Sequence, residues 1–116
     1  MTNEFRLRVV FYRTETGTEP VRDWLKALPL EHKKVIGEDI KTAQYGWPLG
    51  MPLIRKLETE LWEVRSRLDD QIARVIFTVE QDTMVLLHGF IKKSQKTPAR
   101  ELALARRRNA KLKGRL

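Results

Sequence analysis

Cysteine is absent from this chain of 116 residues, which excludes disulfide bridges and thiolate metal sites. Long apolar runs are missing as well: no stretch approaches the roughly 20 residues that cross a bilayer, and the opening MTNEFRLRVVFYR lacks a signal-peptide pattern. Only two histidines occur, without an HExxH motif or paired carboxylates, and there is no glycine-rich phosphate loop or nucleophile elbow. We therefore expect a soluble, cytoplasmic protein that uses no metal and no cofactor.

The chain contains enough hydrophobic residues for a core, and its charged residues are unevenly distributed along the sequence. Its length fits one compact domain covering residues 1–116, and a hydrophobic fraction of 41% can support a single core. The formal net charge is +8, yet the first ninety residues hold 13 basic and 14 acidic side chains. Ten basic side chains and one acidic side chain follow residue 90. Such local concentration of positive charge is typical of a surface that faces phosphate groups.

Hydrophobic periodicity predicts an α+β fold in the order β-α-α-β-β-β-α. Alternation over residues 5–13 indicates a strand, and Pro20 followed by apolar residues at helical spacing indicates a helix that ends at Pro29. A second helix is expected over residues 30–45, a proline- and glycine-rich loop over 46–52, and a last helix after Thr97-Pro98. Between this loop and the last helix, three strands are expected at residues 61–65, 72–80 and 83–92. The turns that connect these three strands are short, so we expect them to be antiparallel neighbours in a sheet of about four strands.

Strand alternation also divides the side chains of this sheet between two faces. The helices need an apolar face, which we expect to comprise Trp62, Val64, Ala73, Val75, Phe77, Val79, Val85, Leu87 and Ile91. The opposite, more exposed face then carries Glu63, Arg65, Arg74, His88 and Lys92. Arg65 and Arg74 are predicted to be cross-strand neighbours, and two like charges in that position are best explained by Glu63 or an anion between them.

These cations suggest cleavage of RNA without a metal, in which the 2′-hydroxyl attacks its neighbouring phosphate. Guanidinium and ammonium groups would stabilise the charge that grows on the phosphoryl oxygens. The candidate catalytic residues are Arg65, Arg74, His88, Lys92, Lys93 and Lys96. A histidine or a lysine could transfer the protons, but spacing does not assign that role.

Each candidate also has a structural interpretation. Arg65 and Arg74 would be solvated strand residues paired with Glu63 and Asp70, and His88 would be a satisfied structural histidine. The lysines would form a plain charged loop, and the arginines at 106–108 a solvated or partner-docking helix face. Spacing alone supports a small α+β domain with a basic face.

Several segments, taken in order, resemble the RelE/ParE toxin superfamily, and more narrowly its phage-derived HigB-type branch. They are FYRTETGTEPVRDWLKALP, Lys56-Leu57, LWEVR, RVIF, LHGFIKK, and KTP leading into a helix with an arginine run, and they cover almost the whole chain. The resemblance implies a RelE fold with helices on one side of an antiparallel sheet and a basic concave face on the other. It also implies the toxin of a type II toxin–antitoxin pair that cleaves mRNA on the ribosome.

The same resemblance implies partners and residue roles. The partner would be a cognate antitoxin of the helix-turn-helix HigA type, with operator DNA contacted only through the complex. Arg74 matches an arginine that stabilises phosphate, and Lys93 matches a basic residue after the last strand, with Lys92, Lys96 and Arg65 beside them. The expected RNA-binding residues are Lys56, Arg106 and Arg107.

One departure from the RelE pattern concerns proton transfer, because no tyrosine stands near the start of the last helix. Two alternatives therefore remain beside the nuclease. The first is a ParE-like inhibitor of DNA gyrase that has no nuclease activity. The second is an inactive, phage-derived nucleic-acid-binding protein.

Overall fold

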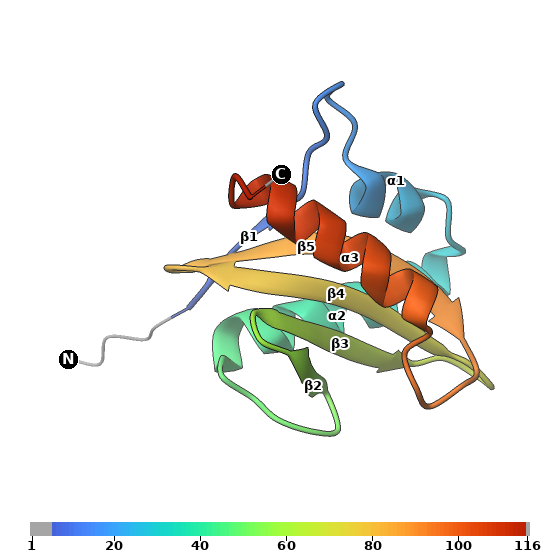
Figure 1. Cartoon of the computed structure of the whole chain (residues 1–116). Helices are drawn as coiled ribbons and strands as arrows, with labels where there is room; N and C mark the ends of the chain where they lie inside the picture. The colour runs from blue at the N-terminus through green and yellow to red at the C-terminus, as the bar shows by residue number, and fades with distance from the viewer. Residues whose placement is uncertain (1–5, 116) are drawn as a thin grey trace.

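The computed structural model describes residues 6–115, which form one mixed sheet with helices on both faces (Figure 1). The first elements are β1 (Arg8–Phe11), α1 (Pro20–Lys26) and α2 (Leu30–Gly46). The strands β2 (Ile54–Glu58), β3 (Leu61–Arg67), β4 (Ile72–Glu80) and β5 (Thr83–Lys92) follow, and α3 (Ala99–Leu112) ends the chain. None of these helices combines the length and apolar character that crossing a membrane requires.

The sheet has five strands in the order β1-β5-β4-β3-β2, one more than the sequence predicted. The extra strand, β2, lies between the proline- and glycine-rich loop and the first predicted strand of the hairpin. It pairs antiparallel with β3, as β3 does with β4 and β4 with β5. The edge strand β1 runs parallel to β5, and between the two the chain passes through α1, α2 and the antiparallel strands β2, β3 and β4.

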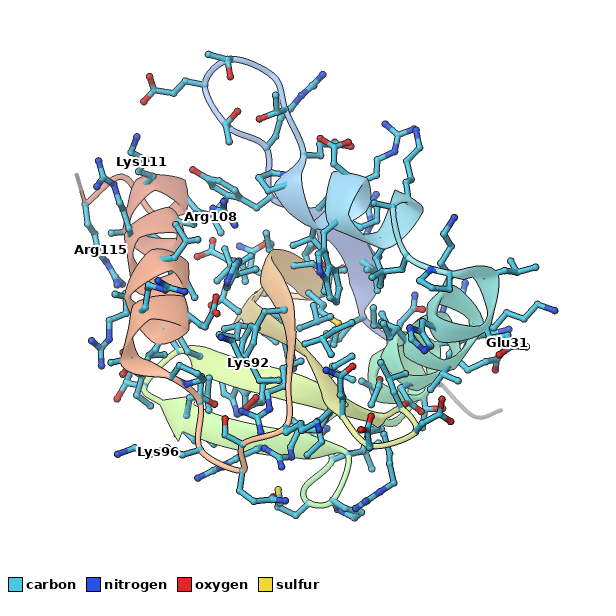
Figure 2. The ribbon with its side chains drawn as sticks, turned by 90° about the vertical axis from the view of Figure 1, so that its right-hand side faces the viewer. Glu31, Lys92, Lys96, Arg108, Lys111 and Arg115 are labelled. Atoms are coloured by element: carbon cyan, nitrogen blue, oxygen red, sulfur yellow. The ribbon has the colours of Figure 1, made fainter. Side chains whose placement is uncertain are left out.

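Helices cover both faces of the sheet, so the expectation of helices on one side only is wrong. Figure 2 shows α3 on one side of the strands and α1 and α2 on the other. The central strand β4 is buried from Ile72 to Thr78, as expected of a strand with a core on each side. The larger core, towards α1 and α2, includes Ile36, Ile40, Val64, Val75, Phe77, Met84 and Leu86. The smaller core, towards α3, includes Leu61, Ile76, Val85, Leu87, Phe90 and Ala105.

A β-bulge in β5 changes the predicted division of faces. Ile76 pairs with His88 but Phe77 pairs with Leu86, so Leu87 is an extra residue without a partner on β4. Val85 and Leu87 consequently lie in the core beneath α3, while Ile91 packs with the core beneath α1 and α2. The prediction that these three residues share one face is therefore wrong.

Gly89 marks the closest contact between β5 and α1, because a Cβ at this position would overlap the indole ring of Trp24. Gly89→Ala should therefore lower the free energy of unfolding by about 1–3 kcal/mol, the usual effect of forcing extra volume into a packed interface. Gly37→Ala, in the middle of α2 and with open space around it, should instead raise stability by about 0.5–1 kcal/mol. Urea denaturation of both variants tests this contrast, and equal effects would contradict it.

Candidate functional site

Arg65 on β3 and Arg74 on β4 face each other directly in the sheet, as strand alternation predicted. Glu63 lies between them: its Oε1 is 3.7 Å from Nε of Arg74, and its Oε2 is 3.8 Å from Nη1 of Arg65. A carboxylate at this point offsets the repulsion between two cross-strand guanidinium groups. The structure therefore brings together Glu63, Arg65 and Arg74 of the predicted polar face, whereas His88 makes its contacts with the last helix.

Arg74 is fully buried, so the expectation that it lies on an exposed face is wrong. The covering segment is loop 93–98, which connects β5 to α3. Nη1 of Arg74 donates to the carbonyl oxygen of Lys96 at 3.0 Å, and Nη2 donates to the carbonyl oxygen of Ser94. Burial lowers the pKa of Arg74, Glu63 opposes this shift, and the charges of Arg65 and Arg55 add to it.

Two further arginines hold the same loop. Nη1 of Arg55, on β2, donates to the carbonyl oxygen of Gln95 at 3.0 Å. Arg65 donates to that oxygen at 3.4 Å and to the side-chain Oε1 of Gln95 at 3.1 Å. Three guanidinium groups from three adjacent strands thus bind oxygens of three consecutive loop residues, and we call Arg55, Arg65 and Arg74 the arginine cluster.

Glu63 and Thr97 anchor the end of the loop that leads into α3. Oγ1 of Thr97 donates to Oε2 of Glu63 at 2.8 Å, and both side chains are buried. Two atoms at the centre of the cluster, Nε of Arg74 and Oε1 of Glu63, are buried without a hydrogen-bond partner. Such atoms are costly, since each has lost its contact with water and gained no full replacement.

The predicted lysines surround the loop. Lys93 and Lys96 are exposed, and Figure 2 shows Lys96 pointing out from the loop into solvent. Lys92, at the end of β5, is partly buried, whereas Lys93 forms an exposed ion pair with Asp70 at 3.3 Å. An exposed pair of this kind is screened by water and leaves the lysine free to exchange partners. The lysines are therefore the accessible cations of the predicted site.

His88 connects β5 to α3. Its Nε2 is 2.6 Å from a carboxylate oxygen of Glu101, and Nη1 of Arg108 lies 3.4 Å from its Nδ1. Because a guanidinium only donates, Nδ1 accepts and Nε2 carries the proton that is given to Glu101. Burial lowers the pKa of His88, the hydrogen bond and charge of Glu101 oppose this, and the charge of Arg108 lowers it further. Both ring nitrogens are engaged, which matches the structural interpretation of this histidine.

Lowering the pH from 7.5 to 5.5 should reduce stability through His88. Its pKa is lower in the folded chain than the usual value of about 6.5, so the unfolded chain binds the proton more readily and stability falls as the pH falls below that value. The slope is at most about 1.4 kcal/mol per pH unit. Glu58 and Glu60, whose pKa values are also lowered, titrate below this window. Denaturation of His88→Gln should show a flatter profile than His32→Gln, and parallel profiles would contradict the assignment.

Comparison with known proteins identifies the family. A family model described as Phage derived protein Gp49-like (DUF891) matches residues 23–110. The chain belongs to this family. Gp49-like proteins are RelE/HigB-type toxins, which confirms the resemblance read from the sequence and makes this chain a toxin of a toxin–antitoxin system.

Two other comparisons accompany this match. The curated proteins contain no match to the chain. A solved structure, the archaeal RelE–RelB complex from Pyrococcus horikoshii, has 20% sequence identity and a TM-score of 0.46, over 81% of this chain and 100% of that chain.

The structure separates the three predicted RNA-binding residues of this Gp49-like toxin. Lys56 pairs with Trp62 in the sheet, and its ammonium group lies 5.8 Å from the centre of that indole ring, on the α2 side. Arg106 is bound through two of its nitrogens to the carboxylate of Glu58. Arg107 is exposed on α3 and is the one of the three that faces solvent without such a contact among residues 6–115.

The positive charge of α3 is partly neutralised within the toxin. Lys113 and Arg115 both donate to the carboxylate of Glu60, at 3.0 and 2.8 Å, as does Asn109 at 3.1 Å. Hydrogen bonds from Arg115 first, then Lys113 and Asn109, hold the pKa of Glu60 far below its ordinary value. These contacts attach the end of α3 to the turn between β2 and β3. Fewer basic side chains of this segment are therefore available to RNA than its sequence contains.

Arg55 is the member of the arginine cluster that sequence reasoning missed, because β2 was not predicted. The signal was present in Ile54 to Leu57, where apolar residues enclose two cations just before the predicted strand that starts at Leu61. Assigning a strand there places Arg55 beside Glu63, which is the register that the structure shows.

A cavity of about 330 Å³ lies beside the cluster, lined by Asp39, Met51, Pro52, Leu53, Arg65, Arg67, Ile72 and Gln95. It combines apolar walls with two guanidinium groups and one residue of loop 93–98. Within residues 6–115, no three side chains of the His, Cys, Asp and Glu types gather closely enough to hold a metal ion.

Proposed function

We propose that this toxin is a ribosome-dependent mRNA endonuclease that inhibits translation. The observation that supports this is the concentration of cations at one end of the sheet: the arginine cluster, with Lys92, Lys93 and Lys96 on and beside the loop that covers it. Three guanidinium groups face one buried carboxylate there, which leaves an excess of positive charge. Such an excess suits a phosphodiester group and the additional charge it gains in the transition state.

In the proposed reaction the RNA itself supplies the nucleophile and the leaving group, and the only other groups required are an acid and a base. The 2′-oxygen attacks the adjacent phosphorus as its proton leaves, the bond to the 5′-oxygen breaks, and that oxygen takes up a proton. The products are a 2′,3′-cyclic phosphate and a 5′-hydroxyl end. Because both ring nitrogens of His88 are engaged, we place these proton transfers outside His88 and the stabilising cations at Arg65, Arg74, Lys92, Lys93 and Lys96.

We further propose that a cognate antitoxin of the helix-turn-helix HigA type neutralises the toxin and that the complex, rather than the toxin alone, contacts operator DNA. Membership of a RelE/HigB-type toxin family supports this pairing. Copurification of the toxin with the product of an adjacent reading frame tests it, and failure of the pair to associate would contradict it.

The nuclease activity is tested by inducing the toxin and mapping mRNA 5′ ends. We expect discrete cuts within the codons of a translated reporter and none in the same reporter with its start codon removed. Growth arrest with intact reporter mRNA would overturn the proposal.

A ParE-like inhibitor of DNA gyrase is the second candidate, and a specific observation favours it. Arg74 is buried and His88 is engaged, so two of the residues expected to act on RNA are not accessible in this structure. The same induced culture distinguishes the two candidates: gyrase–DNA breaks with uncut reporter mRNA would favour gyrase, whereas cut mRNA without such breaks would favour the nuclease.

A further inference from the structure

The contacts between the arginine cluster and loop 93–98 suggest a masked binding site. Five hydrogen bonds join three guanidinium groups to four oxygens: the carbonyl oxygens of Ser94, Gln95 and Lys96 and the Oε1 of Gln95. All four oxygens belong to neutral groups. A phosphate adds direct charge attraction and can accept two parallel N–H bonds from one guanidinium, so the loop is a weaker partner for the cluster than a phosphate group would be.

The loop is also held without an apolar anchor. Ser94, Gln95 and Lys96 are exposed, and Thr97, whose hydroxyl binds Glu63, is the first buried residue after them. Since no hydrophobic side chain of residues 93–96 enters the core, moving this segment exposes little apolar surface. Below it, Nε of Arg74 remains buried without a hydrogen-bond partner, so the closed arrangement leaves a donor that a bound anion could satisfy.

We propose that loop 93–98 masks an anion-binding site formed by Arg55, Arg65 and Arg74, and that displacement of the loop opens this site to one phosphodiester group of RNA. The structure is then the closed, self-inhibited state of the toxin. This inference rests on the proposed function for the identity of the anion, and it adds a regulatory step to that function. An anion that binds only the open state has its apparent affinity reduced by the fraction of molecules that are open.

Fluorescence anisotropy with a labelled single-stranded DNA oligonucleotide tests the mask. This probe carries phosphodiester groups but no 2′-hydroxyl, so it is not cut by the proposed reaction. Thr97→Val removes the hydroxyl that binds Glu63 and should tighten binding about tenfold, the effect of losing one hydrogen bond to a charged group from the closed state. Thr42→Val, an exposed position on α2, is the matched control and should bind as the original chain does.

A second pair of variants breaks one hydrogen bond from its two ends. Gln95→Ala removes the acceptor of Arg65 and should tighten binding about fivefold, whereas Arg65→Ala removes the donor and should weaken binding. A merely structural contact would not produce opposite signs. Gln95 is exposed, so this variant decides the question if Thr97→Val fails to fold.

Unchanged affinity in folded Thr97→Val and Gln95→Ala would overturn the mask. Tighter binding in both, without weakening in Arg65→Ala, would also overturn it, because the oligonucleotide would then bind elsewhere. The oligonucleotide is not cleaved, so these ratios hold whether or not the toxin cuts mRNA. Failure of the mask and failure of the nuclease proposal are therefore separate results.

Discussion

Replacing Arg74 by alanine should lower the free energy of unfolding by about 3–5 kcal/mol, the usual effect of removing one partner from a buried ion pair. The change leaves Glu63 buried with its nearest guanidinium gone, and it removes the two hydrogen bonds that hold Ser94 and Lys96. Chemical denaturation of the purified toxin measures this loss. An inactive Arg74→Ala toxin would therefore reflect loss of folded protein before any loss of catalysis.

Two controls separate burial from charge. Arg67→Ala removes an exposed arginine from the same sheet and should change stability by no more than about 0.5 kcal/mol. The double variant Arg74→Met/Glu63→Leu replaces both buried charges by apolar side chains and should recover much of the stability that Arg74→Met alone loses. Unchanged stability of Arg74→Ala would show that Arg74 is not buried in solution.

The parts of the fold that were predictable from the sequence are those with local signals. The bounds of β4 and β5 follow from alternation and a two-residue turn, and they agree with the structure to the residue. The short strand β2 has five residues beside a segment rich in proline and glycine, so its only sequence signal is the brief pattern of two cations between Ile54 and Leu57. The second helical layer had a signal that we did not use: β4 is almost continuously apolar, which is typical of a strand buried on both faces.

The candidate site also has features that follow from local sequence and features that depend on distant segments. The register of Arg65 opposite Arg74 depends on one hairpin turn and was predictable. The burial of Arg74 depends on loop 93–98, which lies about twenty residues further along the chain, and no local pattern reports such a contact. The position of Leu87 depends on a bulge, and an inserted residue reverses the alternation that follows it. Sequence reasoning therefore identified that Arg65 and Arg74 meet, but it missed both Arg55 and the loop that covers Arg74.

Removing the two exposed lysines of the loop should separate activity from stability. We expect Lys93→Ala/Lys96→Ala to reduce mRNA cleavage about 10²-fold or more, the scale on which loss of a transition-state charge contact slows a reaction. Its free energy of unfolding should stay within about 0.5 kcal/mol of the original, because both side chains are exposed and the Lys93–Asp70 pair lies in water. Reporter mRNA cleavage and urea denaturation of the same protein measure the two effects.

A matched change of charge on the opposite face shows whether position or total charge matters. Lys34→Ala/Lys41→Ala removes two exposed lysines from α2, and it should leave cleavage close to that of the original toxin. Equal losses in both double variants would indicate only a general attraction between a basic protein and RNA. Full cleavage by Lys93→Ala/Lys96→Ala would remove both lysines from the site and, because Arg74 is buried, would leave the partly buried Lys92 and Arg65 as the cations on which a nuclease mechanism depends.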